Sequence, residues 1–508
     1  MKSTAVILMI TTILSKFLGL IRESVKGFCY GTGDVANAYV VAQIIPVIIF
    51  TFIQSGITTG YIPIYNRILK KDGEEAANNF TSNLGNIAFI ISIIILILLE
   101  IFIVPVTKLF ALGDSPETFQ LSVNFTRITV FSIWALALAT VYKSYLNANH
   151  SFVWPNLQGM VLNVFVIAAF FISYKLNNPI ILPIGLCFAL IVQHIVYIPA
   201  IKKTNFKYKF GIDLKDPYLK QMLWLAIPVI VGVAVNQINV IVDISLSSII
   251  ADNGKAIIDY SSRLKEFVNG IVVVSIGTVI YPTLSKHATD NNIDKFKDTI
   301  LSSLTMINIL VLPSVVGLII YANPIVKLIL ERGAFTPEDT VIVGSCLKFY
   351  AISLIGMSIW DIVAKSFYSM QDTKTPTFYS ILMVIINIIL SITLSRFIGI
   401  QGLAVGTSIA SIFGAVMLCI KLKQKLGKFD KLRYTLKEVF KMFLASIIMG
   451  GLSYIVYSLL LNTISSNTIA FFIAVIFAVV IYGILIILFK VEEAKTLIED
   501  FKNKRNKK

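Results

Sequence analysis

Apolar stretches of about 20 residues recur from one end of the chain to the other, separated by short polar segments. Such a stretch is long enough to cross the roughly 30 Å hydrocarbon core of a membrane as a helix. The pattern predicts an all-α integral membrane protein with about 14 transmembrane helices, and its short connections leave no room for a soluble catalytic domain. The predicted spans lie near residues 5–29, 35–61, 82–105, 118–142, 156–175, 179–200, 221–250, 256–282, 298–321, 338–364, 377–396, 401–420, 436–461 and 467–489.

Composition supports this class. Of the 508 residues 56% are hydrophobic and 14% charged, with a mean hydropathy of +0.82. The first apolar stretch continues past Lys16 without a small-residue cleavage site, so we interpret it as a retained span and not a signal peptide. The three histidines and four cysteines lack metal-ligand spacing. We interpret the cysteines, which lie in or beside apolar runs, as packing residues.

The basic residues indicate an orientation. With the N-terminus inside, about 31 of the 44 Lys and Arg residues fall in inner segments, as the positive-inside rule requires. Both termini are then cytoplasmic, and residues 491–508 form a basic cytoplasmic tail. Because the basic clusters flank spans and no soluble domain is attached, the charge of +16 predicts membrane topology and no nucleic-acid partner.

An internal duplication is visible at a shift of roughly 220 residues. Pro105–Leu109 matches Pro324–Leu328, and Ser115–Glu117 matches Thr336–Glu338. Six spans per repeat is an even number, so both repeats enter from the same face and form two parallel lobes, with a substrate site expected between them. The predicted division is an N-terminal lobe at 1–210, a C-terminal lobe at 211–430 and two additional spans at 431–490.

A few ionisable side chains lie within predicted spans, where each charge costs roughly 2.5–3.5 kcal/mol on insertion scales. The first span carries four, and the eighth carries a one-sided stripe. We interpret Arg22 and Arg263 as lining a polar cavity that binds a phosphate or pyrophosphate through bidentate hydrogen bonds. These residues are Lys16, Arg22, Glu23 and Lys26 in the first span, and Asp259, Arg263 and Glu266 in the eighth.

Structural alternatives remain open for the same residues. Arg263 with Asp259 and Glu266 is also consistent with an ion pair that holds helices together. Lys26 and Lys265 are also consistent with side chains that snorkel to the membrane surface or face a neighbouring helix.

Several segments resemble the MurJ (MviN) family, the lipid II flippases of the MOP superfamily. The most specific are Ser15–Glu23, Glu331–Thr336 and Phe367–Pro376. Tyr30–Gly33 with Ala36–Tyr39, and Tyr260–Leu264 with Tyr281–His287, add to the likeness, which runs in order through most of the chain.

The resemblance implies two six-helix lobes around a V-shaped cationic cavity, with two C-terminal helices that help to form a groove for the lipid tail. It also implies that Arg22 and Arg263 are the cavity arginines and that Glu23 is the acidic neighbour. Two departures stand out. Asn37 occupies a position where the family usually has Asp, and the second span has no cation around Pro46.

A sodium-coupled design in some family members implies a further candidate site. Asp243 would supply a carboxylate, with Asn387 and Thr407 as neutral oxygen ligands of the kind that suit a hard cation. Asn387 and Ser391 share one helix face, but Ser391 replaces the expected acid, so a helix–helix hydrogen-bond cluster is the alternative.

The resulting hypothesis is a monomeric bacterial inner-membrane flippase without covalent chemistry or a resident cofactor, coupled to Na⁺, H⁺ or the membrane potential. It moves an undecaprenyl-pyrophosphate-linked peptidoglycan precursor, lipid II, to the outer leaflet. Arg22 and Arg263 neutralise the pyrophosphate and Lys16 or Lys26 assists, while Glu23 and Glu266 complete the predicted substrate-binding residues. The alternative is a flippase for an O-antigen, capsule or teichoic precursor, which the missing second-span cations favour. A drug antiporter, a membrane-embedded glycan polymerase and a passive channel fit the sequence less well.

Overall fold

The structure is a computed structural model, and it describes residues 2–290 and 292–493. Within these ranges every regular element is helical, which confirms the predicted all-α membrane fold. The helices are α1 Lys2–Tyr30, α2 Asp34–Ile101, α3 Ile103–Lys108, α4 Pro116–Thr129, η1 Val130–Ser132, α5 Ile133–Ala148, α6 Val153–Lys175, α7 Ile181–Val192, η2 Gln193–Val196, α8 Tyr197–Ile201, α9 Pro217–Ile250, α10 Gly254–Thr289, α11 Ile293–Ile320, α12 Ala322–Ile329, α13 Pro337–Ser369, α14 Lys374–Ile398, α15 Gln401–Leu426, α16 Leu432–Thr463 and α17 Asn467–Leu488.

The helices follow the predicted spans, and every one of those spans lies on a helix or a helical series. In the described ranges eleven segments are long and apolar enough to cross a membrane. One of them, α2, contains the predicted span 35–61 and most of the span 82–105, which continues into α3. The two parts of α2 meet at Gly73, whose φ of 87° lies in the region that glycine adopts without strain. The number fourteen stays a prediction. Residues 494–508 of the predicted basic tail lie outside the described residues.

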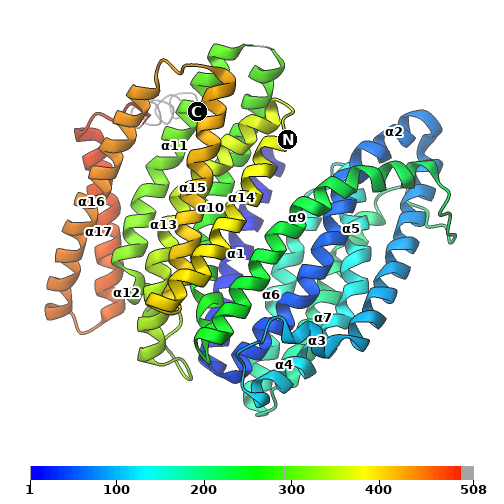
Figure 1. Ribbon diagram of the computed structural model, residues 1–508, viewed down its shortest axis with the longest axis horizontal. Coiled ribbons are helices and arrows are strands. Elements are labelled where there is room, and N and C mark those ends of the chain that lie inside the picture. Colours follow the sequence, from blue (N-terminus) through cyan, green and yellow to red (C-terminus); the bar gives the residue numbers. More distant parts are fainter. Residues whose placement is uncertain (1, 291, 494–508) are drawn as a thin grey trace. The chain divides into compact units, whose positions relative to one another are not determined.

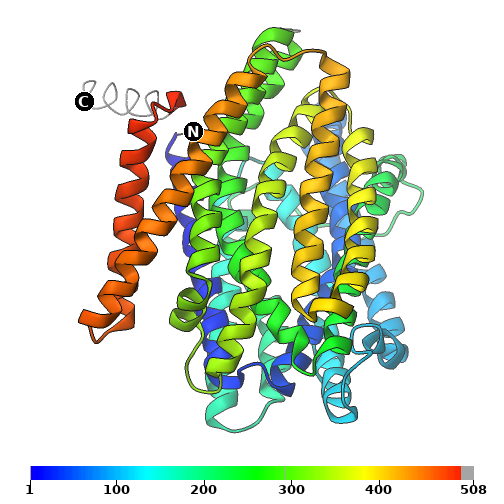
Figure 2. The same cartoon turned by 60° about the vertical axis from the view of Figure 1, so that its left-hand side comes forward.

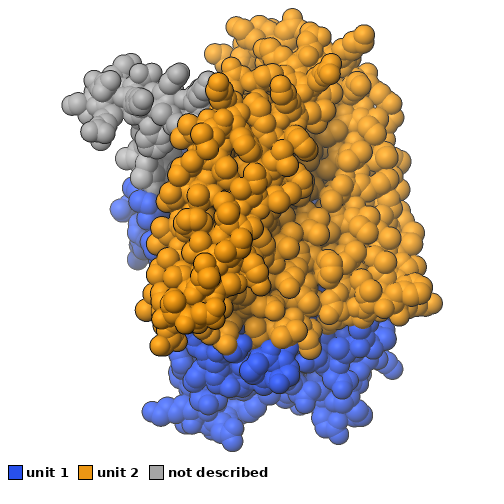
Figure 3. Space-filling model, turned by 90° about the vertical axis from the view of Figure 1, so that its left-hand side faces the viewer, with its two compact units in different colours: residues 1–259, 329–339 blue, residues 260–328, 340–508 orange. Residues whose placement is uncertain are grey.

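Packing divides the chain into two compact units, coloured separately in Figure 3. Unit 1 comprises residues 1–259 and 329–339, and unit 2 comprises 260–328 and 340–508. Helix α10 contributes its first turns to unit 1 and the remainder to unit 2. The lobes predicted from the repeat follow sequence similarity, whereas these units follow contacts, and α9 belongs to unit 1 because it packs on α2.

Helix α2 is the centre of unit 1, where it contacts α4, α5 and α9, while α1 packs on α6 (Figure 1). Small residues bring α2 and α9 together. A Cβ atom on Gly60 would lie 2.5 Å from Met222 Cγ, and one on Gly56 would lie 3.2 Å from Ala226 Cβ. Glycine at these two positions therefore permits an approach that a larger residue would prevent.

A non-helical strap, residues 202–216, connects α8 to α9. Polar side chains of α2 form hydrogen bonds with the backbone of the strap. Asn83 Nδ2 donates to Asp213 O at 2.9 Å, and Asn83 Oδ1 accepts from Asp213 N at 2.8 Å. Asn86 Nδ2 donates to Gly211 O at 2.7 Å, and Lys209 N donates to Ser82 Oγ at 3.2 Å. Backbone N–H and C=O groups of the strap thus find their hydrogen-bond partners in side chains of α2 and not in a β-sheet.

Unit 2 contains two close helix pairings. Helices α14 and α15 approach at Gly402, where a Cβ atom would lie 2.5 Å from Ser395 N. Helices α16 and α17 lie side by side, as Figures 1 and 2 both show, and α16 packs against α11. The buried Tyr482 hydroxyl donates to Ile309 O at 2.8 Å, which fixes α17 on α11. The two spans predicted outside the repeat, α16 and α17, are therefore attached to the rest of unit 2 by contacts with α11.

Candidate functional site

Four charged side chains form a continuous cluster in unit 1, which we call the α1 charge cluster: Arg22, Glu23, Lys26 and Asp259. Arg22 donates to Glu23 Oε1 through Nη2 at 2.7 Å and through Nε at 3.2 Å. Lys26 Nζ lies 2.6 Å from Glu23 Oε2 and 2.5 Å from Asp259 Oδ2. All four residues are buried, and Lys26 is only 1% exposed.

Helix geometry explains most of this arrangement. Glu23 and Lys26 are three residues apart and therefore neighbours on the surface of α1. Asp259 comes from the first turns of α10 and adds the second carboxylate. The formal charges of the two cations and two carboxylates cancel, and this pairing offsets part of the free energy that burying the charges costs. The cluster therefore offers a positive charge to a substrate only when a cation, such as Arg22, is released from its carboxylate.

The other predicted ligands lie in different surroundings. Lys16 is exposed on α1, six residues before Arg22. Arg263 lies half-buried on the part of α10 that belongs to unit 2. In that unit Glu266 binds Lys265 Nζ through Oε1 at 2.7 Å and accepts from Asn269 Nδ2 at 3.0 Å. Lys265 also lies 5.5 Å from the centre of the Tyr350 ring, so it faces a neighbouring helix and does not snorkel.

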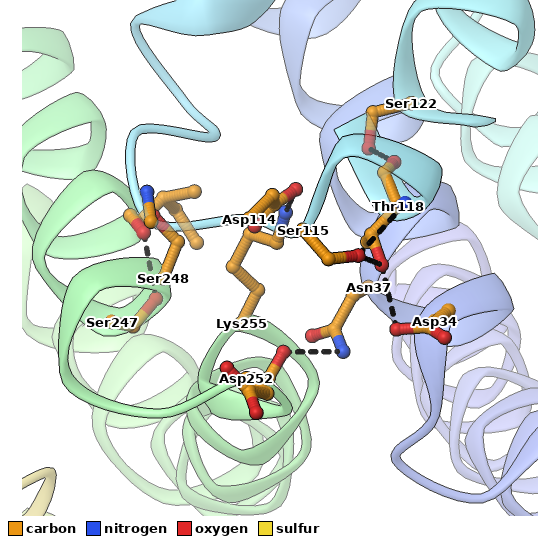
Figure 4. A network of polar contacts seen from close by, with 12 residues as sticks. Asp34, Asn37, Asp114, Ser115, Thr118, Ser122, Ser247, Ser248, Asp252 and Lys255 are labelled. Carbon is orange, nitrogen blue, oxygen red and sulfur yellow. Dashed lines mark hydrogen bonds and ion pairs between the residues drawn. The ribbon is translucent and has the colours of Figure 1, made fainter. Parts of the chain in front are cut away.

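A second polar cluster in unit 1, the α10 entry network, surrounds the first turn of α10 (Figure 4). The Lys255 ammonium is fully buried and bonds to Asp114 in the segment between α3 and α4. Burial raises the pKa of Asp114, and the attraction of Lys255 offsets this only in part. Asn37 joins the same network: Oδ1 accepts from Ala256 N at 2.9 Å, and Nδ2 donates to the carbonyls of Thr32, Gly33 and Asp252 at 3.1–3.2 Å.

The network extends to the segment before α13 and gives two sequence motifs a structural role. Thr32 Oγ1 donates to Asp339 Oδ1 at 2.6 Å, while Ala334 N donates to Phe28 O at 2.9 Å. The backbones pass so closely that a Cβ on Gly31 would lie 2.4 Å from Ala334 O, and Gly31 has a φ of +53°. The Tyr30–Gly33 and Glu331–Thr336 segments therefore pack directly on each other.

Sequence reasoning missed Lys255 and Asp114 because both lie outside the predicted spans. A signal was present nevertheless. Lys255 is the second residue of α10, where the positive end of the helix dipole disfavours a cation. A lysine at that position indicates a nearby carboxylate, although the sequence does not say which one.

The candidate sodium ligands divide between the units. In unit 2, Asn387 Nδ2 donates to Thr407 Oγ1 at 3.1 Å, and Ser391 Oγ donates to Asn387 Oδ1 at 3.3 Å. Asp243 belongs to α9 in unit 1, where Asn239 Nδ2 donates to it at 3.3 Å. The neutral oxygens suit a hard cation, but they already join α14 to α15. In the described ranges no group of three His, Cys, Asp or Glu side chains forms a metal cluster.

Charged side chains buried within long apolar helices, in a fold of packed membrane spans, are typical of membrane proteins that bind or move polar or charged substrates, such as transporters. A family profile described as lipid II flippase MurJ matches residues 28–492. The chain belongs to this MurJ family.

Individual relatives agree with that assignment. A probable lipid II flippase MurJ of Thermotoga maritima is 29% identical over 500 residues, covering 96% of each chain. Its counterpart in Vibrio cholerae serotype O1 is 28% identical over 461 residues, covering 88% of this chain and 87% of the relative.

Solved structures extend the comparison. A lipid II flippase MurJ in an inward closed conformation has a TM-score of 0.83 at 28% identity, covering 97% of this chain and 100% of that one. An inward-facing multidrug resistance MATE family transporter of the MOP superfamily has a TM-score of 0.72 at 14% identity, covering 82% of this chain and 96% of that one. The second likeness shows a shared fold alone.

Proposed function

We propose that this protein flips lipid II, the lipid-linked peptidoglycan precursor, from the inner to the outer leaflet of a bacterial cell membrane. Membership of the MurJ family over residues 28–492 carries the proposal, because the curated relatives are named as lipid II flippases. Flipping changes no covalent bond, so the chain needs binding groups and a conformational cycle, and no catalytic group.

The α1 charge cluster supplies the binding step. The Arg22 guanidinium is held by Glu23 Oε1. A pyrophosphate competes with that carboxylate, because guanidinium groups form bidentate hydrogen bonds with phosphate oxygens. Glu23 keeps its contact with Lys26 when Arg22 turns to the substrate. Glu23 therefore acts as a stand-in anion that stabilises the cationic side chain before substrate arrives.

Arg263 is the proposed second contact from the C-terminal repeat, with Lys16 and Glu266 as peripheral members of the site. The lobes then exchange access by rocking, as transporters built from parallel repeats do. Both termini are cytoplasmic in this scheme. The membrane potential is a suitable driving force, since moving one charge through 100 mV is worth about 2.3 kcal/mol.

Coupling to Na⁺ or H⁺ is the accompanying proposal for Asp243, Asn387 and Thr407. The carboxylate of Asp243 and the oxygens of the α14–α15 pair have the hard-ligand chemistry that sodium prefers. If the coupling ion is Na⁺, replacing it with K⁺ slows flipping by the wild type. The same replacement leaves the residual rate of Asp243→Asn unchanged, and an equal sodium response in both proteins contradicts the assignment.

Arginine substitution tests the proposed function. Replacing Arg22 with Ala removes a charge-assisted contact worth about 1.5–3 kcal/mol, so flipping of lipid II by reconstituted protein should fall at least tenfold. Arg22→Lys should lie between Ala and wild type, since lysine keeps the charge and loses the bidentate geometry.

Growth of cells depleted of their native flippase gives the second readout. Wild-type protein should restore growth, and the Arg22→Ala and Arg263→Ala variants should not. Full rescue by both variants contradicts the proposed site. Equal or faster transport of another undecaprenyl-linked sugar in the reconstituted assay contradicts lipid II as the preferred substrate.

A further inference from the structure

A groove in unit 1 lies between α5 and the η2–α8 segment, outside the residues discussed so far. Its volume is about 400 Å³, within the roughly 300–1,000 Å³ typical of small-molecule sites. Trp134 and Leu138 form one wall, and Ile195 and Ile198 form the other. The two isoleucines are 56% and 47% exposed, so the groove opens to the lipid that surrounds a membrane helix.

The strap closes one end of this groove. Phe206 packs edge-on against Tyr142, with ring centres 5.9 Å apart, and lies 5.0 Å from the ring centre of Tyr145. The Tyr145 hydroxyl donates to Thr204 Oγ1 at 3.0 Å. The closed end is therefore built from fixed tertiary contacts.

The same end carries cations. Lys202 lines the groove, and Lys203 lies 6.0 Å from the ring centre of Trp154. Lys207 and Lys209 follow on the exposed side of the strap. None of the described residues that line the groove is acidic, so this end is complementary to an anion.

A histidine gives the apolar interior one polar feature. His194 lines the groove, and neither of its ring nitrogens has a hydrogen-bond partner among the described residues. Both nitrogens are buried from water. A buried polar group without a partner is unfavourable, so His194 is a polar side chain that the residues around the groove leave unsatisfied.

We propose that the groove binds one anionic phospholipid of the inner leaflet, with an acyl chain between α5 and α8 and the phosphate at Lys202. The leaflet assignment rests on the cytoplasmic orientation proposed above. Lysines near a membrane surface attract anionic headgroups, and the His194 side chain lines the apolar part of the groove. The bound lipid would anchor the strap, and with it the start of α9, to the membrane.

Trp134 provides a reporter inside the groove. The chain has four tryptophans, and replacing Trp154, Trp224 and Trp360 with Phe leaves Trp134 as the only one. The full-length variant is reconstituted in phosphatidylcholine bilayers that contain a small, fixed share of chain-brominated lipid. We expect brominated phosphatidylglycerol to quench Trp134 fluorescence at least twice as strongly as the same share of brominated phosphatidylcholine.

Matched charge variants sharpen the result. Lys202→Gln should abolish the preference for phosphatidylglycerol, whereas Lys220→Gln, at an exposed lysine of α9, should keep it. Equal quenching by the two lipids, or a preference that survives Lys202→Gln, overturns the proposal. Displacement of the signal by an equal share of a polyprenyl diphosphate also overturns it, because the groove would then hold the substrate's lipid.

A second measurement does not depend on the tryptophan substitutions. Phosphatidylglycerol that co-purifies with the otherwise unmodified chain should fall at least twofold on Lys202→Gln and stay constant on Lys220→Gln; no difference between the variants contradicts the proposal. Both measurements report occupancy and not flipping, so a negative outcome would leave the proposed function untouched.

Discussion

Unit 1 contains two lysines with almost no exposed surface, and they are neutralised in different ways. Lys26, the last charged residue of α1, binds two carboxylates, Glu23 and Asp259. Lys255, in the first turn of α10, has one ion-pair partner in the described ranges, Asp114. One cluster lies where the sequence predicts substrate binding, while the other joins loops that the sequence treats as connections.

The two lysines differ in the number of carboxylates that pair directly with them. A buried charge that loses its only counter-charge leaves an uncompensated ion, whereas a charge with two partners keeps one. The α1 charge cluster is therefore able to exchange partners, as a substrate site must. In the α10 entry network Asp114 is the direct ion-pair partner of Lys255 among the described residues, and Asp34 attracts the ammonium only from a longer distance. The other polar groups of the network hold α2, α10 and the segments before α2 and α4 together.

The largest expected effect comes from Asp114→Asn. Removing the carboxylate leaves the Lys255 ammonium buried without its counter-charge, which typically costs about 3–5 kcal/mol. Equilibrium unfolding in detergent should show a loss of that size.

The double variant Lys255→Met with Asp114→Leu is the control for Asp114→Asn. It removes both charges and fills the space with apolar atoms, so it should recover most of the lost stability. A double variant as unstable as Asp114→Asn would mean that shape, and not charge compensation, dominates here.

Asp259→Asn should have a smaller effect. Lys26 keeps Glu23 at 2.6 Å, so the loss from the Lys26–Asp259 pair is that of one charged hydrogen bond, about 1.5–3 kcal/mol. The same unfolding measurement tests this value. A loss equal to that of Asp114→Asn would show that Glu23 does not compensate and would remove the distinction between the two lysines.

The Asn37→Asp substitution introduces the residue that the family resemblance implies at this position and should still destabilise this chain. The carboxylate keeps the contact with Ala256 N and gains up to about 1 kcal/mol from the α10 dipole. It also places an acceptor against three carbonyls that Nδ2 now satisfies, which costs about 1–3 kcal/mol.

The net loss expected for Asn37→Asp is therefore about 1 kcal/mol, and Asn37→Ala, which loses both sets of contacts, should lose more. An aspartate variant more stable than wild type would contradict the described hydrogen bonds.

The helices were predictable because apolar length and 3.6-residue packing are local properties of the sequence. Charges within an apolar stretch are conspicuous, so the sequence also singled out Arg22 and Glu23, which the structure places in one buried ion pair, while their role in binding stays a prediction. The sequence did not pair Lys26 with Asp259, which are 233 positions apart, because no local pattern encodes that contact. Asn37 looked like a simple departure from the family, and its three carbonyl partners explain it only once the loops are placed.

The structural role of the Phe367–Pro376 segment could not be predicted from the sequence either. Asp372, between α13 and α14, accepts hydrogen bonds from Thr375 N and Thr375 Oγ1 at 3.0 Å and from Lys425 Nζ at 2.5 Å. Lys425 extends from the end of α15, so the aspartate links three helices of unit 2. The Phe367–Pro376 segment thus forms the turn between α13 and α14, and the Asp372 carboxylate in this segment accepts the hydrogen bonds that cap the start of α14.

The smallest predicted effect comes from Asp372→Asn, and it depends on pH. Burial alone would raise the pKa of Asp372, but the hydrogen bonds from Lys425 and Thr375 lower it below the usual value of 3.8. A carboxyl whose pKa is depressed on folding adds stability above its unfolded pKa of about 4, and that stability is lost as the pH falls through the folded value. Because Lys425 is 41% exposed, solvent screens the pair, and we expect less than about 1 kcal/mol at pH 7. Unfolding of wild type and Asp372→Asn from pH 7 to pH 3 should give curves that converge at the acid end, and a constant difference would show that the aspartate acts through shape alone.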